Sequence, residues 1–169
     1  MPAPTISRIV SGGQTGVDRA ALDVAIYLEI PHGGWCPRGR RAEDGTISTA
    51  YQLTETSSSN YVVRTEKNVT DSDGTLILYR DRMSRGTALT ASFARRHRRP
   101  HLGIDLAPMQ TDDSDEAWIE LQVEEIHQWL VKEAIEVINV AGPRESTTAG
   151  ISTDAHRLLL SVFAEISGN

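Results

Sequence analysis

Three loops rich in glycine, serine and threonine are the places along this chain where a small anion could bind. The first is Ser11–Gly16, which lies between an apolar run and a helical pattern. Glycine lets the backbone approach an anion closely, and a helix start presents free amide hydrogens with a favourable dipole. The loop has neither the Gly-Lys-Ser/Thr ending of a Walker A loop nor the GxGxxG spacing of a dinucleotide fingerprint. It therefore indicates either an anion site or a tight structural turn.

Two further loops have the same character. Residues 80–87 place Arg85 directly before an expected helix start at Gly86, and residues 141–150 contain Arg144 followed by hydroxyl side chains. An arginine guanidinium can bind phosphate or carboxylate through two hydrogen bonds. Each loop taken alone could be an ordinary capped surface loop. If all three follow parallel strands of one sheet, however, they meet at its carboxyl edge and face a single crevice.

The segment Gly33–Gly45 combines an aromatic ring, a thiol and three arginines. Positive charge from Arg38 and Arg40 is expected to favour the thiolate of Cys36, which would make it a soft metal ligand or a reactive group. The alternative is an unreactive, partly buried cysteine. Because Cys36 is the only cysteine, an internal disulfide and a multi-cysteine zinc site are excluded.

Carboxylates and a basic cluster are further candidates. Asp71 and Asp73 could bind a metal or a sugar hydroxyl, or they could end a helix before a strand. Asp18, near a helix start, could simply complement the helix dipole. The cluster Arg95–Arg99 resembles a nucleic-acid patch, but cations are also favoured at the end of a helix.

The composition indicates a globular cytoplasmic protein. Of the 169 residues, 39% are apolar and 24% are charged, and the first residues have neither a basic start nor an apolar core. We expect no membrane-spanning segment. The net charge of -6 argues against general binding to nucleic acid or to a membrane surface. Lys67 and Lys132 are the only lysines among the 17 bases, so arginine either serves anion binding here or reflects a GC-rich genome.

Apolar periodicity alternates strands with helices along the whole chain. We expect strands at Ile6–Val10, Ile30–Trp35, Thr75–Tyr79, His101–Asp105 and Glu136–Val140. We expect helices at Val17–Glu29, Asn60–Thr70, Gly86–Arg98, from about 116 to Lys132, and Ile151–Ile166. Such alternation implies parallel strands, right-handed crossovers and helices on both faces of the sheet. The prediction is a single Rossmann-like, doubly wound α/β domain over residues 1–169, with a mainly parallel sheet of about five or more strands and a flexible tail at 1–5.

Two segments do not fit this simple pattern. The polar stretch Cys36–Ser59 is long for a loop inside a compact domain, so it is either functional or contains short elements without a clear periodic signal. The helix Val17–Glu29 is apolar nearly all round, because Leu22 and Ile26 lie off its main apolar stripe. That predicts a second contact for this helix, such as a subunit interface.

Five motifs, spread over about residues 6–165, together resemble the molybdenum cofactor carrier protein family. They are SGGQTGVDRAALDVA at 11–25, GGWCPRGRRAEDG at 33–45, Y.L.ET at 51–56, RTE.NV.DSDGTLIL at 64–78 and NVAGPRES at 139–146. The family is Rossmann-like and related to the lysine-decarboxylase-like phosphoribohydrolases. The resemblance implies a protein that binds the molybdenum cofactor, a pterin with a terminal phosphate and a dithiolene-bound molybdenum, as its cargo. It also implies storage, protection and delivery of that cargo to molybdoenzymes or cofactor insertion proteins, by a homo-oligomer for which a tetramer is favoured.

The resemblance and the loops together select the residues expected to bind the cofactor. They are Gly12, Gly13, Gln14, Thr15, Gly16, Cys36, Arg38, Arg40, Arg85, Gly86, Thr87, Gly142, Pro143, Arg144, Glu145 and Ser146. We assign no residue a catalytic role and none a metal-ligating role. The phosphate is expected on a helix start, at Gly12–Gly16 or Pro143–Thr147, with Arg144 supplying charge.

One departure from the enzymatic relatives bears on catalysis. Those relatives carry a PGGxGTxxE motif, whereas the helix start at Ser84–Ala91 has no glutamate after Gly86 and Thr87. The expectation is therefore a carrier and not an enzyme. The alternative is an enzyme or sensor for a nucleotide-derived ligand, which would need a carboxylate such as Asp71 or Asp73 beside the ribose.

Overall fold

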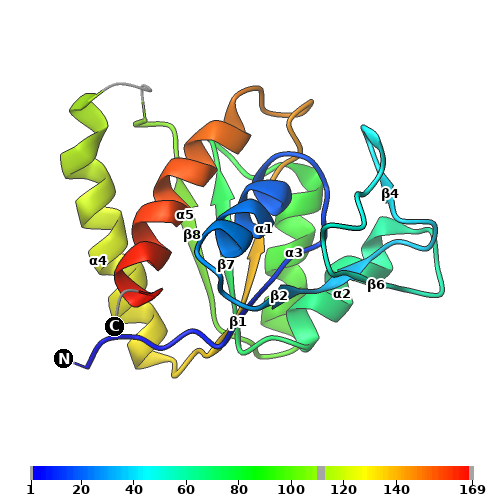
Figure 1. Cartoon of the computed structure of the whole chain (residues 1–169), viewed down its shortest axis with the longest axis horizontal. Helices are drawn as coiled ribbons and strands as arrows, with labels where there is room; N and C mark the ends of the chain where they lie inside the picture. Colours follow the sequence, from blue (N-terminus) through cyan, green and yellow to red (C-terminus); the bar gives the residue numbers. More distant parts are fainter. Residues whose placement is uncertain (1, 110–112, 168–169) are drawn as a thin grey trace.

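A computed structural model describes residues 2–109 and 113–167 and contains a five-stranded parallel sheet (Figure 1). The strand order is β2-β1-β9-β7-β8, and all four neighbouring pairs are parallel. The strands are β1 Arg8–Val10, β2 His32–Gly33, β7 Gly74–Tyr79, β8 His101–Asp105 and β9 Val137–Ala141. The predicted Rossmann-like class is confirmed, because the sheet is parallel and its strands are joined through helices.

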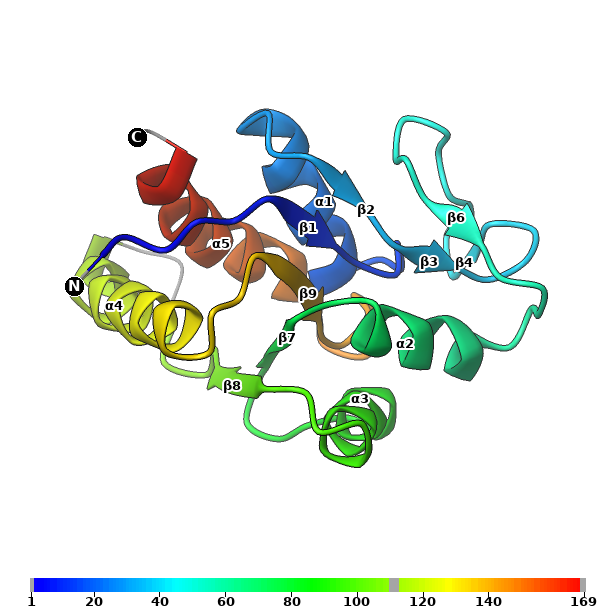
Figure 2. The same ribbon diagram turned by 90° about the horizontal axis from the view of Figure 1, so that it is seen from below.

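Helices cover both faces of this sheet, as Figure 2 shows. Helices α1, α4 and α5 pack on one face, and α2 and α3 pack on the other. Their bounds are α1 Val17–Tyr27, α2 Tyr61–Thr70, α3 Arg85–Arg96, α4 Glu116–Lys132 and α5 Ile151–Ser167, with a short 3-10 turn at Asp113–Asp115. The larger apolar core lies on the α1, α4 and α5 side, whereas Val69, Phe93 and Ala94 form a small cluster between α2 and α3.

Sequence periodicity accounts for these elements. Strand β7 reads Gly-Thr-Leu-Ile-Leu-Tyr and is buried along almost its whole length, as expected for a central strand covered on both faces. In α5 the buried residues recur every three or four positions and form one stripe that is apolar except for Asp154. They are Ile151, Asp154, Ala155, Leu158, Leu159, Val162 and Phe163. None of the helices within residues 2–109 and 113–167 is long and apolar enough to cross a membrane.

The long polar segment after Cys36 contains short elements without a clear sequence signal. The expected strand Ile30–Trp35 is interrupted at Gly34, which has φ +123 and divides it into β2 and β3, Trp35–Cys36. Strand β3 pairs in parallel with β6, Thr54–Glu55. Between them a hairpin joins β4, Arg41–Ala42, to β5, Gly45–Thr46. Two-residue strands are too short to show a period of two, so the sequence pattern could not reveal them.

Arg40 holds this segment in place from inside. Its guanidinium donates to the carbonyl oxygens of Ile47, Ser48, Tyr51 and Leu53 at distances between 2.7 and 3.3 Å. Four backbone acceptors on one side chain restrain a segment that otherwise has little apolar packing.

Helix α1 has the predicted apolar character, but the chain itself covers most of it. Leu22 is fully buried within the protomer, so its burial needs no partner. Ile26 is 43% exposed and Tyr27 is 73% exposed, and both lie in the last turn of α1. A subunit contact stays a prediction for these two side chains.

Candidate functional site

A cleft of about 320 Å³ lies at the carboxyl ends of the parallel strands. The three glycine-rich loops all contribute to it, as expected for loops that follow parallel strands. Eight of the predicted cofactor-binding residues line it, namely Gly12, Gln14, Arg85, Gly86, Thr87, Gly142, Pro143 and Arg144. The other eight are not among its lining residues. They are Gly13, Thr15, Gly16, Cys36, Arg38, Arg40, Glu145 and Ser146.

Close backbone contacts between the first and third loops explain two of the glycines. A Cβ added to Gly16, where φ is +82, would lie 2.3 Å from the carbonyl oxygen of Pro143. The amide of Val17 donates to that same oxygen at 3.3 Å. A Cβ at Gly142 would lie 2.3 Å from the carbonyl oxygen of Leu78. These glycines therefore set the position of one loop against the next, which is a structural role beside any contact with a ligand.

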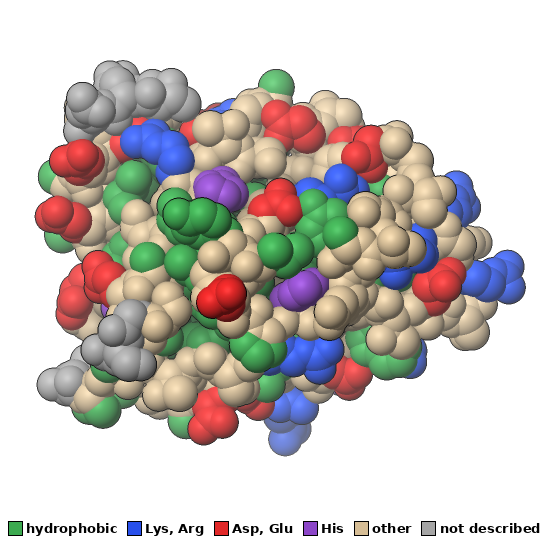
Figure 3. All heavy atoms as spheres, viewed as in Figure 1, with side chains coloured by type: hydrophobic (Ala, Val, Ile, Leu, Met, Phe, Trp, Pro, Cys, Tyr) green, Lys and Arg blue, Asp and Glu red, His purple; other side chains and the backbone are tan. Residues whose placement is uncertain are grey.

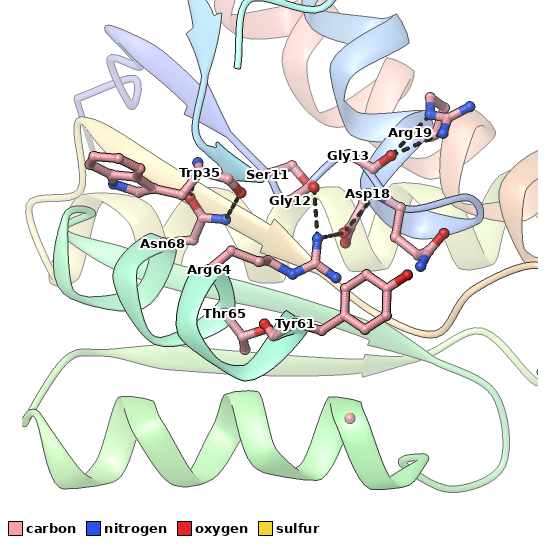
Figure 4. Close-up of polar contacts among 12 residues, drawn as sticks. Ser11, Gly12, Gly13, Asp18, Arg19, Trp35, Tyr61, Arg64, Thr65 and Asn68 are labelled. Atoms are coloured by element: carbon pink, nitrogen blue, oxygen red, sulfur yellow. Dashed lines mark hydrogen bonds and ion pairs between the residues drawn. The ribbon is translucent and has the colours of Figure 1, made fainter. Parts of the chain in front are cut away.

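Helix α2 supplies a wall of the cleft that the search through loops missed. From this helix Arg64 reaches across to the first loop, donating to the carbonyl oxygen of Gly12 at 2.6 Å (Figure 4). The ring of Tyr61 lies 5.4 Å from the Arg64 guanidinium and 5.9 Å from that of Arg144. The motif RTE.NV.DSDGTLIL, which begins at Arg64, was the available signal that this helix matters.

Asp18 is the carboxylate that the structure places in the cleft. It is 7% exposed, lines the cleft, and accepts a hydrogen bond from the amide of Gln14 at 3.3 Å. Its Oδ2 lies 3.6 Å from Nη1 of Arg64 (Figure 4). Burial raises the pKa of Asp18 above its usual value, and the positive charge of Arg64 offsets only part of that effect. Asp18 is thus more than a partner of the helix dipole.

The start of α3 and the third loop contribute further basic residues to the cleft. The hydroxyl of Ser84 caps this helix by accepting from the amide of Thr87 at 3.4 Å. Arg85 is exposed, and the side chain of Arg144 is 45% exposed. A Cβ added to Gly86 would meet no atom within 4 Å, so open space adjoins the first turn. Three arginines against one aspartate make the lining positive, in a chain of net charge -6.

Charge is also unevenly distributed over the molecular surface. On the face drawn in Figure 3, acidic side chains gather at the α4 end, whereas basic side chains gather at the end where the β4 hairpin lies. The local potential on this face therefore differs from what the total charge suggests.

Glu43, from the hairpin between β4 and β5, binds the outer rim of the site. Its carboxylate accepts hydrogen bonds from the hydroxyls of Thr15 and Ser146 and, at 3.2 Å, from the amide of Ser146. Its amide donates at 2.9 Å to Oε1 of Gln14. Two hydroxyls expected to contact the cofactor are thus engaged by a carboxylate of the chain itself. Glu145 is engaged too, because its carboxylate accepts from the amides of Gly150 and Ser152 at the start of α5.

The rim contact predicts a dependence on acid pH. Hydrogen bonds from Ser146 and Thr15 lower the pKa of Glu43 below its usual value. The contact therefore stabilises the fold fully above the usual glutamate pKa, and this contribution is lost as the pH falls through the lower value of the folded state. We expect wild type to have a higher free energy of unfolding than Glu43→Gln at about pH 6, and this difference to shrink as the pH falls below the usual glutamate pKa, measured by urea unfolding. An advantage that persists undiminished at the lower pH would contradict the assignment.

The cysteine segment lies outside the cleft. Cys36 is completely buried, and burial raises the pKa of its thiol more than the charge of Arg40 lowers it. The expectation of a favoured thiolate is therefore wrong, and the unreactive alternative describes Cys36 better. Arg38 is exposed and belongs to the same segment. Within the described ranges no cluster of three or more His, Cys, Asp or Glu side chains could hold a metal ion.

The two acids considered for a ribose are engaged elsewhere. Asp71 accepts from the indole nitrogen of Trp35 at 2.7 Å. Asp73 accepts from the amides of Glu136 and Val137, at the amino ends of the strands and away from the cleft. Neither lines the cleft.

Comparison with known proteins places this fold and cleft in a family. A family model described as "Circularly permutated YpsA SLOG family" matches residues 9–163. The chain belongs to the circularly permutated YpsA SLOG family. A crystal structure named "Putative molybdenum carrier protein", from Syntrophus aciditrophicus SB, is similar to this SLOG protein, with 46% identity and a TM-score of 0.87. The alignment covers 96% of this chain and 97% of the other. No curated protein matches. The family-level resemblance drawn from the five motifs is confirmed.

Proposed function

We propose that this chain is a carrier that binds the molybdenum cofactor as its cargo in the cleft at the strand carboxyl ends. The observation that carries the proposal is the polarity of this cleft, whose lining combines two accessible arginines and a helix start with polar side chains that are buried. A phosphate fits the first part, and a polar heterocycle fits the second. The similarity to a protein named as a molybdenum carrier supports the choice of cargo.

The start of α3 is the position we propose for the phosphate. Arg85 and Arg144 can approach it, and the space beside Gly86 is open. Directly after the first loop, the first turn of α1 carries Asp18, whose negative charge repels a phosphate. The hydroxyls of Thr15 and Ser146 already bind Glu43. Electrostatics therefore favour α3 over the helix start after Ser11–Gly16, with Arg144 contributing from the third loop.

A carrier must also shield its cargo and release it. The volume of about 320 Å³ is at the lower end of the usual range for ligand pockets, so we propose that the metal end of the cofactor extends toward the outer rim. Delivery to molybdoenzymes or insertion proteins would then occur from that rim. We further propose a cytoplasmic homo-oligomer, with the exposed Ile26 and Tyr27 in its interface.

A nucleotide-derived ligand is the second candidate, and Asp18 is the observation that favours it. A carboxylate in a phosphate-binding cleft can accept hydrogen bonds from a ribose diol as well as from a heterocycle. An enzyme acting on such a ligand would release ribose 5-phosphate from a nucleoside monophosphate.

An anaerobic binding experiment separates the two candidates. The purified chain is mixed with molybdenum cofactor, passed through gel filtration and analysed for bound molybdenum and pterin. We expect saturable retention that inorganic phosphate competes away, because both need the same arginines. We also expect no release of ribose 5-phosphate from nucleoside monophosphates. Absence of retention, or turnover of a nucleotide, would refute the carrier proposal.

A further inference from the structure

The charged residues mark two ends of the cleft, an accessible one with Arg85 and Arg144 and a buried one where Asp18 lies 3.6 Å from Arg64. At the mouth, Arg85 at the start of α3 and Arg144 in the third loop are accessible. Deeper, Asp18 lies between the first loop and α2, with 10% of its side chain exposed. A ligand that fills both ends must carry negative charge on one part and hydrogen-bond donors on another. A simple dianion does not fit both ends, because Asp18 would repel its second charge.

Asp18 has unused acceptor capacity. A carboxylate accepts about four hydrogen bonds. The contacts of Asp18 are the Gln14 amide at 3.3 Å, the Arg64 guanidinium at 3.6 Å and the nearby Ser11 hydroxyl, which itself donates to the carbonyl oxygen of Val140 at 2.8 Å. The contacts from Gln14 and Arg64 both reach Oδ2 of Asp18, and both are long. Arg64 is held more firmly by the carbonyl oxygen of Gly12, at 2.6 Å. The carboxylate is thus buried without being saturated.

We propose that Asp18 is the specificity residue of the cleft and that it binds the donor edge of a pterin, formed by the ring N3–H and the adjacent 2-amino group. This inference rests on the proposed function and names the part of the cargo that is recognised. Two parallel N–H donors match the two oxygens of one carboxylate, as a guanidinium does. Tyr61 lines the same cleft, where its ring packs against the guanidinium groups of Arg64 and Arg144.

Gln14 complements Asp18 in this recognition. Its Oε1 accepts from the amides of Thr15 and Glu43 at 3.0 and 2.9 Å. What Gln14 can still offer a ligand is therefore its pair of Nε2–H donors. Gln14 and Asp18 both line the cleft, and the main-chain amide of Gln14 donates to the carboxylate of Asp18. A pterin has the complementary order of hydrogen-bonding groups, because its C4 carbonyl is an acceptor for Gln14 next to the N3–H donor for Asp18.

The energetic argument favours a donor ligand at Asp18. Burying a carboxylate that is only partly hydrogen-bonded is costly, and burial raises the pKa of Asp18 accordingly. A ligand that donates two hydrogen bonds relieves this cost in the bound state. A ligand with a carbonyl in place of the amino group sets an acceptor against the carboxylate and is rejected.

The test compares two ligands that differ at one position. A pterin with a phosphomethyl group at position 6 and the lumazine with the same substituent, which has an oxygen in place of the 2-amino group, are titrated calorimetrically into wild type, Asp18→Asn and Asp23→Asn. Wild type is expected to bind the pterin about tenfold to a hundredfold more tightly than the lumazine. Asp18→Asn should lose this preference. Asp23→Asn, on the same helix but in contact with Tyr51 outside the cleft, should keep it.

Inorganic phosphate and AMP complete the experiment. If phosphate binds wild type, and the pterin and the lumazine bind it with equal affinity, the role of Asp18 is overturned. The anion site of the proposed function is then still supported. Tighter binding of AMP than of the pterin, lost in Asp18→Asn, would assign the carboxylate to a ribose diol and overturn the inference. If neither phosphate nor the phosphorylated pterin binds wild type, the proposed function fails and the inference fails with it. Equal binding of the two pteridines by wild type decides against Asp18 even if Asp18→Asn does not fold.

Discussion

Replacing Gly142 by alanine is expected to destabilise the fold by about 3 kcal/mol, one of the largest effects of a single methyl group in this chain. The added Cβ would lie 2.3 Å from the carbonyl oxygen of Leu78 and 2.5 Å from Cγ2 of Val17. The carbonyl belongs to the central strand β7, and Val17 is the first residue of α1, so neither can move without shifting a whole element. Urea unfolding of the variant measures the loss.

Gly86→Ala is the matched control, because it adds the same methyl group at another glycine that lines the same cleft. Its Cβ meets no atom within 4 Å, and alanine is a better helix former than glycine in the first turn of α3. We expect unchanged or slightly higher stability, together with weaker phosphate binding because the methyl group enters the space beside the helix start. Equal destabilisation by both variants would show that Gly142 has no special packing role.

The sequence predicted the layered fold because its strands and helices are long enough to show a period. Strand β7 is a run of buried, mostly aliphatic residues, and α5 repeats its buried positions every three or four residues. Their alternation dictates parallel pairing and brings three loops to one edge. The residues that this reasoning selected include five that line the cleft, namely Gly12, Gly86, Gly142, Arg85 and Arg144.

Contacts between residues far apart in the chain could not be predicted in this way. Glu43 accepts a hydrogen bond from Ser146, which lies 103 positions later in the chain. Glu43 itself lies in a hairpin whose strands have only two residues each and give no periodic signal. Arg64 reaches the first loop from a helix whose pattern of apolar residues specifies only which side packs on the sheet. The sequence also did not indicate which arginines are available to a ligand. Arg40 donates to backbone carbonyl oxygens inside the chain, whereas Arg144 is accessible. Residue type alone does not distinguish these two outcomes.

The accessibility of Arg144 leads to the prediction with the largest expected effect on binding. Arg144→Ala is expected to weaken the binding of a phosphorylated pterin about tenfold to a hundredfold, the range for losing one charge-assisted hydrogen bond. The fold should remain intact, because the side chain is 45% exposed and its closest carboxylate, on Glu43, lies 4.0 Å away. The turn that positions it depends on the main chain, since the amides of Thr147 and Thr148 donate to the carbonyl oxygen of residue 144 whatever its side chain.

Arg96→Ala is the matched control for charge. Arg96 lies in the last turn of α3, at the end of that helix opposite to the cleft, and it is exposed. Both variants remove one positive charge, so any attraction that depends only on total charge falls equally in the two. Isothermal titration calorimetry at two salt concentrations distinguishes the mechanisms, because diffuse attraction is screened within about 8 to 10 Å at physiological ionic strength, whereas a direct contact is screened much less. A loss confined to Arg144→Ala that persists at high salt identifies a specific phosphate contact. Equal losses that disappear at high salt would mean that the cleft attracts anions without a defined binding position.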